Sequence, residues 1–317
     1  MRDDFQRDIT YLRVSVTDLC NLRCRYCMPE EGVAKRCHTD ILRLEEIEEI
    51  VRAAAELGVR KVRVTGGEPL VRPGVIDLCG HISAIDGIDE VDITTNGLLL
   101  ERDAAALAQA GVRRVNVSLD TLNPDRFRQM TRGGELDQVL RGLDAARRAG
   151  LTPIKINAVL IGGFNDDEIP ALVELTRKEE IEVRFIELMP LGPGAEFPKE
   201  AFLPCSVVPE RVPELKALDA VSGVARLYQL PGGVGRVGLI SPVSCDFCAQ
   251  CDRLRLTSDG RLKPCLHSAE EIPLRGLHGA ELRAAILKGV HRKPQRHDPL
   301  GPGAPTAGGR PMNRIGG

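Results

Sequence analysis

Three cysteines near the start of the chain, Cys20, Cys24 and Cys27, have a spacing that can support redox chemistry. Thiolates in a C-x3-C-x2-C pattern can each bind one iron of a cubane 4Fe–4S cluster, which leaves the fourth iron without a protein ligand. A small molecule can chelate that open iron, so the cluster can become a reaction site. A zinc site or structural thiols are the alternatives, but zinc favours paired C-x2-C motifs and no fourth ligand follows close by. The spacing therefore favours the cluster.

A second group of cysteines follows much later, at Cys245, Cys248, Cys251 and Cys265. Four thiols at this spacing can hold zinc tetrahedrally, and a second iron–sulfur cluster bound by three or four of them is the other option. The spacing alone leaves both interpretations open.

Two arginines, Arg253 and Arg255, lie inside this second group. Because they are two positions apart, their side chains share one face of an extended segment. Planar guanidinium groups suit the recognition of phosphates or ring edges better than lysine does. Surface arginines on a turn are the alternative interpretation.

Composition sets the protein class. The 317 residues carry a net charge of −2, with 43% hydrophobic and 28% charged residues, which is typical of a soluble globular protein. This balance argues against a general polynucleotide or membrane-surface binder, because there is no excess of positive charge. No apolar run approaches the ~18 residues of a membrane span, so we expect a cytoplasmic protein. In that compartment the ten cysteines are better explained as metal ligands than as disulfides.

Six segments alternate apolar and polar residues in the way that strands do. They are 11–17, 61–65, 91–94, 115–120, 154–158 and 183–185, and helical patterns fall at 44–57, 104–110 and 135–149. Strands that alternate with helices at this spacing predict parallel βαβ units. We therefore predict an α/β fold whose core is a TIM-like β/α barrel or a part of one.

The second half of the chain has a different residue pattern. Residues 191–224 are interrupted by prolines and predict a connection with a short helix, while 228–230 and 237–240 predict a hairpin. We place a domain boundary near residue 220, with a core at 1–220 and a C-terminal region at 221–317. The tail, 294–317, is rich in glycine and proline, and its composition predicts disorder.

The alternating strands also predict where the polar side chains lie. Helices cover the outer face of a β/α barrel, so that face is apolar and the polar positions point inward. These positions are Arg13, Ser15, Thr17, Lys61, Arg63, Thr65, Thr94, Asn116, Ser118, Lys155, Asn157 and Arg184. Five of them are cations, which are costly in one lumen unless acidic partners or an anionic ligand lie there too. The alternative is that some lie at strand ends, in solvent or in ion pairs.

Several motifs together resemble one family, the GTP 3′,8-cyclases, which are radical S-adenosylmethionine enzymes that open molybdenum cofactor biosynthesis. The resemblance covers the chain from about residue 8 to its end and is weak at 191–225. It rests on RVSVTDLCNLRCRYCMP at 13–29, TGGEPL at 65–70, TTNG at 94–97, VSLD at 117–120, RFIELMP at 184–190 and FCAQCDRLRL at 247–256. It implies a partial, open TIM-like barrel with a C-terminal iron–sulfur extension.

The resemblance also implies cofactors and their ligands. Cys20, Cys24 and Cys27 match the ligands of a first 4Fe–4S cluster that binds S-adenosylmethionine. The positions that match contacts to this cofactor are Tyr26, Gly67, Ser118 and Met189. The ligands of a second 4Fe–4S cluster, whose free iron binds guanine, match Cys248, Cys251 and Cys265. Cys245 lies outside that triad.

The implied reaction converts GTP to 3′,8-cyclo-7,8-dihydro-GTP. In this family a 5′-deoxyadenosyl radical takes hydrogen from C3′ of GTP, and the sugar radical then attacks C8, a lyase reaction. Positions that match GTP contacts are Arg13, Arg63, Thr94, Lys155, Arg253 and Arg255, of which Arg13, Arg253 and Arg255 are the candidate catalytic residues. Lys61 and Arg184 are expected near the phosphates, and the terminal Gly316 and Gly317 match a tail that enters the active site.

The expected partners are GTP, a reductant protein that the sequence does not identify, and a second copy of the chain, since dimers are common in the family. No polynucleotide or membrane partner is expected. Two alternatives remain open. A radical enzyme that modifies peptides or matures other proteins would ignore GTP and leave the inward Lys155 and Arg184 without a purpose. A non-catalytic protein with two structural metal sites would contain zinc and no iron.

Overall fold

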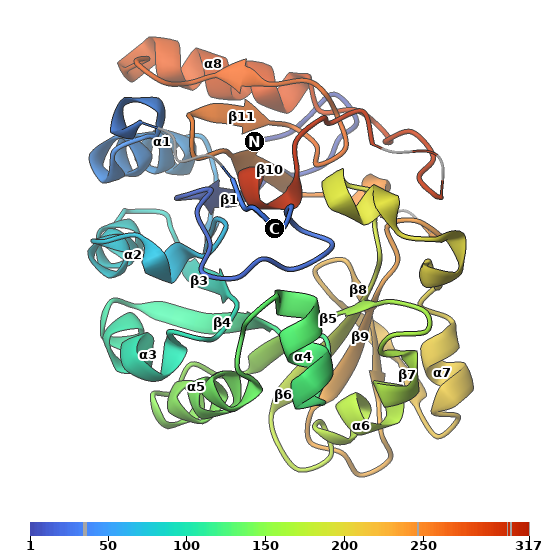
Figure 1. The fold of residues 1–317 in the computed structure, drawn as a ribbon. Coiled ribbons are helices and arrows are strands. Elements are labelled where there is room, and N and C mark those ends of the chain that lie inside the picture. The colour runs from blue at the N-terminus through green and yellow to red at the C-terminus, as the bar shows by residue number, and fades with distance from the viewer. Residues whose placement is uncertain (34–36, 246, 303, 305, 317) are drawn as a thin grey trace.

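The computed structural model describes residues 1–33, 37–245, 247–302, 304 and 306–316. Its core is a curved sheet of six consecutive parallel strands (Figure 1). The strands are β1 (Tyr11–Ser15), β2 (Lys61–Thr65), β3 (Glu90–Thr95), β4 (Val112–Ser118), β5 (Ile154–Leu160) and β6 (Ile181–Glu187). All six predicted strands are confirmed, with their ends shifted by a few residues.

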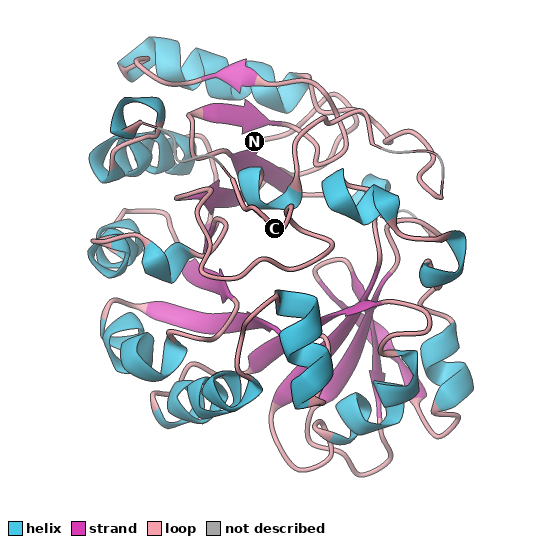
Figure 2. Ribbon diagram, viewed as in Figure 1, coloured by secondary structure: helices cyan, strands magenta, loops and turns pink. Residues whose placement is uncertain are grey.

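Helices connect the strands, and most of them lie along the outer side of the sheet (Figure 2). They are α1 (Leu44–Glu56), α2 (Val75–Ser83), α3 (Leu100–Gln109), α4 (Pro124–Thr131), α5 (Leu136–Arg148) and α6 (Ile169–Glu174). The predicted helices correspond to α1, α3 and α5, whereas the shorter α2, α4 and α6 were not predicted from the sequence.

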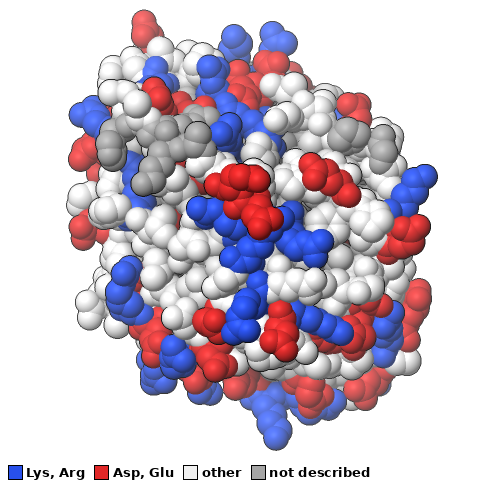
Figure 3. Space-filling view, viewed as in Figure 1, with Lys and Arg blue, Asp and Glu red and all other residues white. Residues whose placement is uncertain are grey.

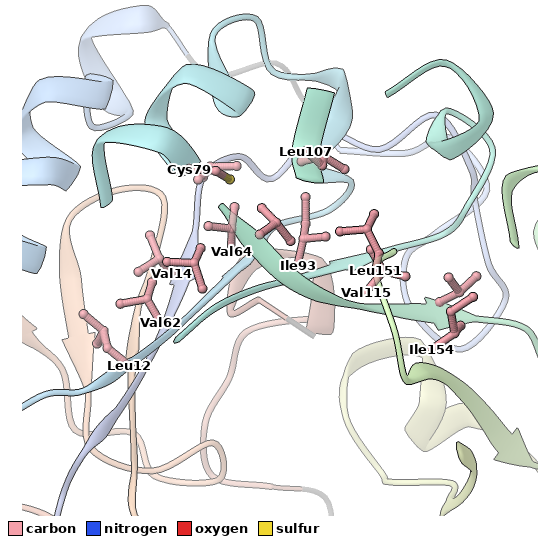
Figure 4. Close-up of a cluster of buried hydrophobic side chains, with 14 of the residues drawn as sticks. Leu12, Val14, Val62, Val64, Cys79, Ile93, Leu107, Val115, Leu151 and Ile154 are labelled. Atoms are coloured by element: carbon pink, nitrogen blue, oxygen red, sulfur yellow. The ribbon is translucent and has the colours of Figure 1, made fainter. Parts of the chain in front are cut away.

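The apolar side of the strands forms the main core against these helices. Figure 4 shows Val64 and Ile93 lying close to Cys79 of α2 and Leu107 of α3. All four side chains are fully buried. The outer face is therefore apolar, as the alternation predicts, and Cys79, which lies outside the two cysteine groups, is one of its core residues.

The C-terminal half adds strands to both edges of this sheet. At one edge β10 (Arg253–Leu256) pairs in parallel with β1, followed by β11 (Arg261–Lys263) and β12 (Ile272–Pro273). At the other edge β9 (Arg236–Ile240) pairs in parallel with β6, followed by β8 (Ala225–Gln229) and β7 (Lys216–Ser222). The result is one sheet of 12 strands with two free ends, so the barrel is open as predicted.

The remaining helices lie in this half: α7 (Val207–Arg211) is the short helix expected before residue 224, and α8 (Gly279–His291) packs against α1. The hairpin expected around Pro231 is confirmed as β8 and β9. The boundary placed near residue 220 falls inside β7, and the division at 220 stays a prediction about folding units. Within the described residues, none of the helices has the length and apolar character needed to cross a membrane.

The tail corrects one prediction. Its composition predicts disorder, but Met312–Arg314 form a turn of 3-10 helix, and Asn313 and Ile315 are each only 1% exposed. The Asn313 side-chain amide donates to the backbone oxygen of Asp18 at 3.1 Å. Composition underestimates order here because these few residues pack into a surface that the rest of the fold supplies.

Candidate active site

The first thiol group lies on the loop that follows β1. Backbone hydrogen bonds join this loop to the end of α4, from Arg23 N–H to the Thr131 oxygen (2.9 Å) and from Arg25 N–H to the Met130 oxygen (3.0 Å). These bonds fix the segment that carries Cys24.

The loop after β2 closes over the same segment. Gly67 N–H donates to the Thr17 oxygen at 2.7 Å, and Glu68 N–H donates to the Leu19 oxygen at 2.8 Å. A Cβ atom on Gly67 would lie 2.4 Å from that Leu19 oxygen, so only glycine allows the two backbones to approach this closely. The TGGEP segment therefore positions the thiol loop directly.

The three thiols fit an iron–sulfur cluster. Burial and the neighbouring thiols raise the pKa of Cys24 well above its usual value, and burial raises the pKa of Cys27 to about 12. Thiolates at these positions need a positive partner, which an iron centre supplies. The Leu22 N–H donates to the Cys20 sulfur at 3.3 Å, a contact of the kind that stabilises cluster thiolates.

A single metal ion fits the thiols less well. Across the described ranges, no three His, Cys, Asp or Glu side chains are grouped as one bound ion would require. A cubane differs because each thiolate binds a separate iron.

The positions predicted to contact S-adenosylmethionine lie around this loop. The Tyr26 hydroxyl donates to Asp120 at 2.9 Å, and Asp120 also accepts from the Val159 N–H at 2.8 Å. Burial raises the pKa of Asp120 to about 6. Ser118 ends β4 beside Asn157 of β5, and Met189, just after β6, lines the neighbouring cavity.

A cavity of about 310 Å³ lies inside the curve of the sheet. Its lining includes seven of the predicted inward residues, namely Arg13, Lys61, Arg63, Asn116, Lys155, Asn157 and Arg184. Arg253 and Arg255 also line it, because the β10–β1 pairing places Arg255 beside Arg13. Thr94 is not among the lining residues, and its hydroxyl has no hydrogen-bond partner among the described residues.

Acidic residues balance part of this positive charge. Asp92 lies 2.7 Å from Arg63 and 2.8 Å from Lys61. Burial opposes ionisation of Asp92, but these two cations outweigh it and hold its pKa below the usual range. Figure 3 shows basic side chains gathered near the centre of the viewed face, with acidic side chains next to them.

A second acidic residue pairs with two other cations of the cavity. Glu182 accepts from Arg184 at 2.5 Å and lies 3.3 Å from Lys155. Burial lowers the pKa of Lys155 to about 8, with Arg184 acting in the same direction and Glu182 opposing it. The sequence prediction that acids or an anionic ligand must accompany the cations is therefore met in part by Asp92 and Glu182.

The second thiol group faces the same cavity. Its lining includes Cys248, Cys251 and Cys265, whereas Cys245 is exposed and its sulfur lies 3.1 Å from a donor nitrogen of Arg226. Lys293 donates to the Cys251 sulfur at 3.3 Å. Burial opposes ionisation of Cys251, but Lys293 lowers its pKa overall. Three thiols beside cations can hold a second cluster with an open iron.

The cavity also contains Tyr11, Arg114 and Lys293, which were not predicted from the sequence, although the strand alternation could have identified the first two. Tyr11 and Arg114 each lie two positions before a predicted inward residue, so the same alternation places them on the inner face. The third, Lys293, follows α8 and had no local signal.

Tyr11 is an aromatic centre among cations. The distances from its ring centroid are 5.5 Å to Lys61, 5.6 Å to Arg63 and 5.5 Å to Arg253. Burial raises the pKa of Tyr11, but these cations outweigh that effect and lower it below the usual value. The ring face attracts cations, which lets three of them gather here.

The tail completes the cavity wall. The Gly316 oxygen accepts from Arg255 at 2.5 Å, and a Cβ on Gly316 would lie 2.3 Å from the Thr65 hydroxyl. Met312 is among the lining residues. Gly316 therefore contacts a residue of the cavity wall, whereas Gly317 lies outside the described residues.

Comparison with known proteins agrees with this geometry. Residues 14–176 match the family model of the radical SAM superfamily, and 181–299 match that of Molybdenum Cofactor Synthesis C. In fold the chain is similar to Streptococcus suis SuiB, with a TM-score of 0.59 at 16% identity, covering 91% of this chain and 67% of that one. The chain belongs to the radical SAM superfamily.

Sequence relatives define the family more narrowly. A GTP 3′,8-cyclase of Alkaliphilus oremlandii is 50% identical over 321 residues, covering 100% of both chains. One from Alkaliphilus metalliredigens is 53% identical over 302 residues, covering 94% of each. The chain is a member of the GTP 3′,8-cyclase family, whose enzymes use S-adenosylmethionine with a 4Fe–4S cluster and carry an additional C-terminal cluster.

Proposed function

We propose that GTP binds in the cavity between the two thiol groups and is cyclised there between C3′ and C8, with S-adenosylmethionine as the co-substrate. The observation that carries this proposal is that the second thiol group, the basic strand faces and Met189, a predicted S-adenosylmethionine contact, all border one cavity. The product would be 3′,8-cyclo-7,8-dihydro-GTP, in the first step of molybdenum cofactor biosynthesis.

The substrate contacts follow from charge and position. A triphosphate carries about four negative charges, and Arg13, Arg63 and Lys155 line the cavity on three different strands. Arg253 and Arg255 lie on β10 beside the second thiol group, where their guanidinium planes suit phosphate oxygens or a ring edge. We assign substrate binding to these five residues and catalytic roles to Arg13, Arg253 and Arg255. Thr94 is assigned to substrate binding from the family resemblance, since it does not line the cavity.

The cofactor contacts are assigned from the positions of the residues around the two thiol groups. Cys20, Cys24 and Cys27 would hold the first cluster, and Cys248, Cys251 and Cys265 the second. Tyr26, Gly67, Ser118 and Met189 would contact S-adenosylmethionine between them. When bound, the first cluster and S-adenosylmethionine supply the 5′-deoxyadenosyl radical that takes hydrogen from the substrate.

The remaining task of the protein is orientation and protection. A carbon radical must be kept from water, and the tail contributes to the shielding because Met312 lines the cavity and Gly316 contacts Arg255 of its wall. Fixing the sugar against the attacking carbon is a problem of orientation, which cations on opposite walls can solve.

The test uses the full chain, reconstituted without oxygen and supplied with GTP, S-adenosylmethionine and a reductant. We expect GTP-dependent formation of 5′-deoxyadenosine and of the cyclised nucleotide. Arg253→Ala should lower turnover about 10- to 100-fold while the spectrum of the first cluster persists. Arg283→Ala, a half-buried arginine of α8 paired with Glu56 and outside the cavity lining, is the matched control. Absence of GTP-dependent 5′-deoxyadenosine would refute the function, and loss of the fold on Arg253→Ala would make Arg253 structural.

Three further parts of the proposal concern the electron donor, the oligomeric state and the location of the protein in the cell. We infer a reductant protein as electron donor, because the chemistry consumes an electron. A homodimer is inferred from the family resemblance, and sedimentation analysis would test it. A cytoplasmic location is supported by ten free cysteines, since reduced thiols are retained there.

A further inference from the structure

Lys293 is a buried cation beside the second thiol group. Lys293 is 3% exposed. Its ammonium donates to the Cys251 sulfur (3.3 Å), the Arg253 backbone oxygen (2.8 Å) and the Pro264 backbone oxygen (2.9 Å). An ammonium has three N–H donors, so these contacts use all of them. All the hydrogen-bond donors of this side chain are therefore used beside the second thiol group.

These contacts join two separate segments. Cys251 and Arg253 lie on either side of the start of β10, whereas Pro264 directly precedes Cys265. One side chain thus connects the two parts of the chain that carry the proposed cluster ligands. It does so from outside both segments, two residues after α8 ends at His291.

Within the part of the chain that the structure describes, the ammonium of Lys293 has no carboxylate partner. No Asp or Glu among the described residues lies within ion-pair distance of its ammonium, while the buried Lys155 and Lys263 each have one. A buried charge without a counter-charge is costly, so such groups are paired or contact a metal site. Of the three contacts of its ammonium among the described residues, two are backbone oxygens and the third is the Cys251 sulfur.

We propose that Lys293 is a positioning residue for the second cluster, which fixes Cys251 against the Cys265 segment and places a positive charge on a cluster ligand. The inference rests on the proposed function only in taking an iron–sulfur cluster as the occupant of this thiol group. Hydrogen bonds and charge beside the sulfurs set the reduction potential of a cluster, and second-shell partners commonly change metal affinity 10- to 100-fold.

The experiment isolates the second cluster. In the full chain, Cys24→Ala removes one ligand of the first group, so iron that remains after anaerobic reconstitution belongs to the second. Lys293→Met, Lys293→Gln and Lys293→Arg are made in this background, with Lys288→Met, an exposed lysine of α8, as the matched control. Iron release to a chelator and the reduction midpoint, followed by electron paramagnetic resonance, are measured without GTP.

We expect Lys293→Met to release iron about 10- to 100-fold faster than the control and to lower the reduction midpoint. Lys293→Gln should lower the midpoint with a smaller effect on release, because it keeps a donor without the charge. Lys293→Arg should restore the midpoint. Release and midpoint equal to the control in Lys293→Met would overturn the proposal.

The alternative outcomes are separable. If Lys293→Met fails to fold, equal midpoints in Lys293→Gln and Lys293→Arg would overturn the proposal, since a structural role ignores charge. A Cys24→Ala chain that binds no iron would overturn the cluster assignment and this inference together. Because no measurement uses GTP, failure of GTP turnover in the wild-type chain would leave the Lys293 result intact.

Discussion

At the scale of single residues, Lys155 is the cavity cation whose charge should respond to pH. Its pKa is lowered to about 8 by burial and by Arg184, and Glu182 opposes both. A triphosphate binds the charged form more tightly. GTP affinity should therefore be nearly constant below about pH 8 and weaken above it, as the ammonium loses its proton.

Calorimetric titration of the reconstituted chain with GTP, from about pH 6.5 to about pH 9.5, would measure this dependence. Lys155→Arg keeps the charge throughout that range, because guanidinium does not lose its proton there. It should flatten the curve while the wild-type chain weakens about 10-fold across the upper half of the range. Identical curves for the two proteins would show that Lys155 does not contact the triphosphate.

The sequence predicted the positions of single side chains well where the alternation along a strand determines them. The inward positions Arg13, Lys61 and Lys155 follow from strand periodicity, and Tyr11 and Arg114 obey the same rule. Lys293 could not be found in this way, because its partners are brought near by a helix and two loops. The acids Asp92 and Glu182, which also lie on strands, pair with these cations across or along neighbouring strands, and no local pattern predicts such pairs.

At the scale of elements, the close approach of two loops controls the first thiol group. Gly67 has no room for a side chain, since the Leu19 and Asp18 backbones lie 2.4–2.8 Å from where its Cβ would be. Gly67→Ala should push the thiol loop away from β2. We expect loss of most iron from the first cluster and of 5′-deoxyadenosine formation, with the second cluster retained.

Gly80→Ala is the control, because Gly80 lies inside α2 with its nearest neighbours at 3.8–4.0 Å. Alanine there should preserve iron content and stabilise the helix by about 0.5–1 kcal/mol. Iron and sulfide quantitation of both proteins, together with the electron paramagnetic resonance signal of the first cluster, measures whether that cluster is lost. Full iron content in Gly67→Ala would mean that the loops can separate without cost to the cluster.

The elements themselves were predictable, whereas their order at the sheet edges was not. Each of β1 to β6 has a local alternation, and successive parallel strands pair as neighbours. The pairings of β10 with β1 and of β9 with β6 join segments far apart in sequence. These two pairings place Arg253, Arg255 and the second thiol group over the open barrel, so the core of the fold follows from the sequence while the closure of the site does not.

At the scale of the whole molecule, the C-terminal tail returns to the first two strands at the site. The tail passes the second thiol region and ends against β1 and β2, where Gly316 contacts Arg255 and Thr65. Thr306 also ties the tail inward, with its hydroxyl donating to the His267 oxygen at 3.0 Å. The position of the last residues thus depends on contacts made earlier in the tail.

Arg310 is the strongest of these contacts. Its guanidinium lies 3.0 Å from both oxygens of Asp259 and 2.6 Å from Glu271, so two carboxylates hold one side chain. Charge-assisted pairs with this fork geometry are stronger than neutral hydrogen bonds. We expect Arg310→Ala to loosen the segment 311–316 and to lower GTP turnover about 10-fold, with both clusters retained.

Limited trypsin digestion reads the tail directly, because cleavage after Arg314 releases its last residues in a mass spectrum. Cleavage should accelerate in Arg310→Ala and be intermediate in Arg310→Lys, which keeps the charge but not the fork. Arg292→Ala, an exposed arginine of the same region, is the control. Equal cleavage and turnover in Arg310→Ala and Arg292→Ala would mean that the inner contacts of Asn313 and Gly316 hold the tail by themselves.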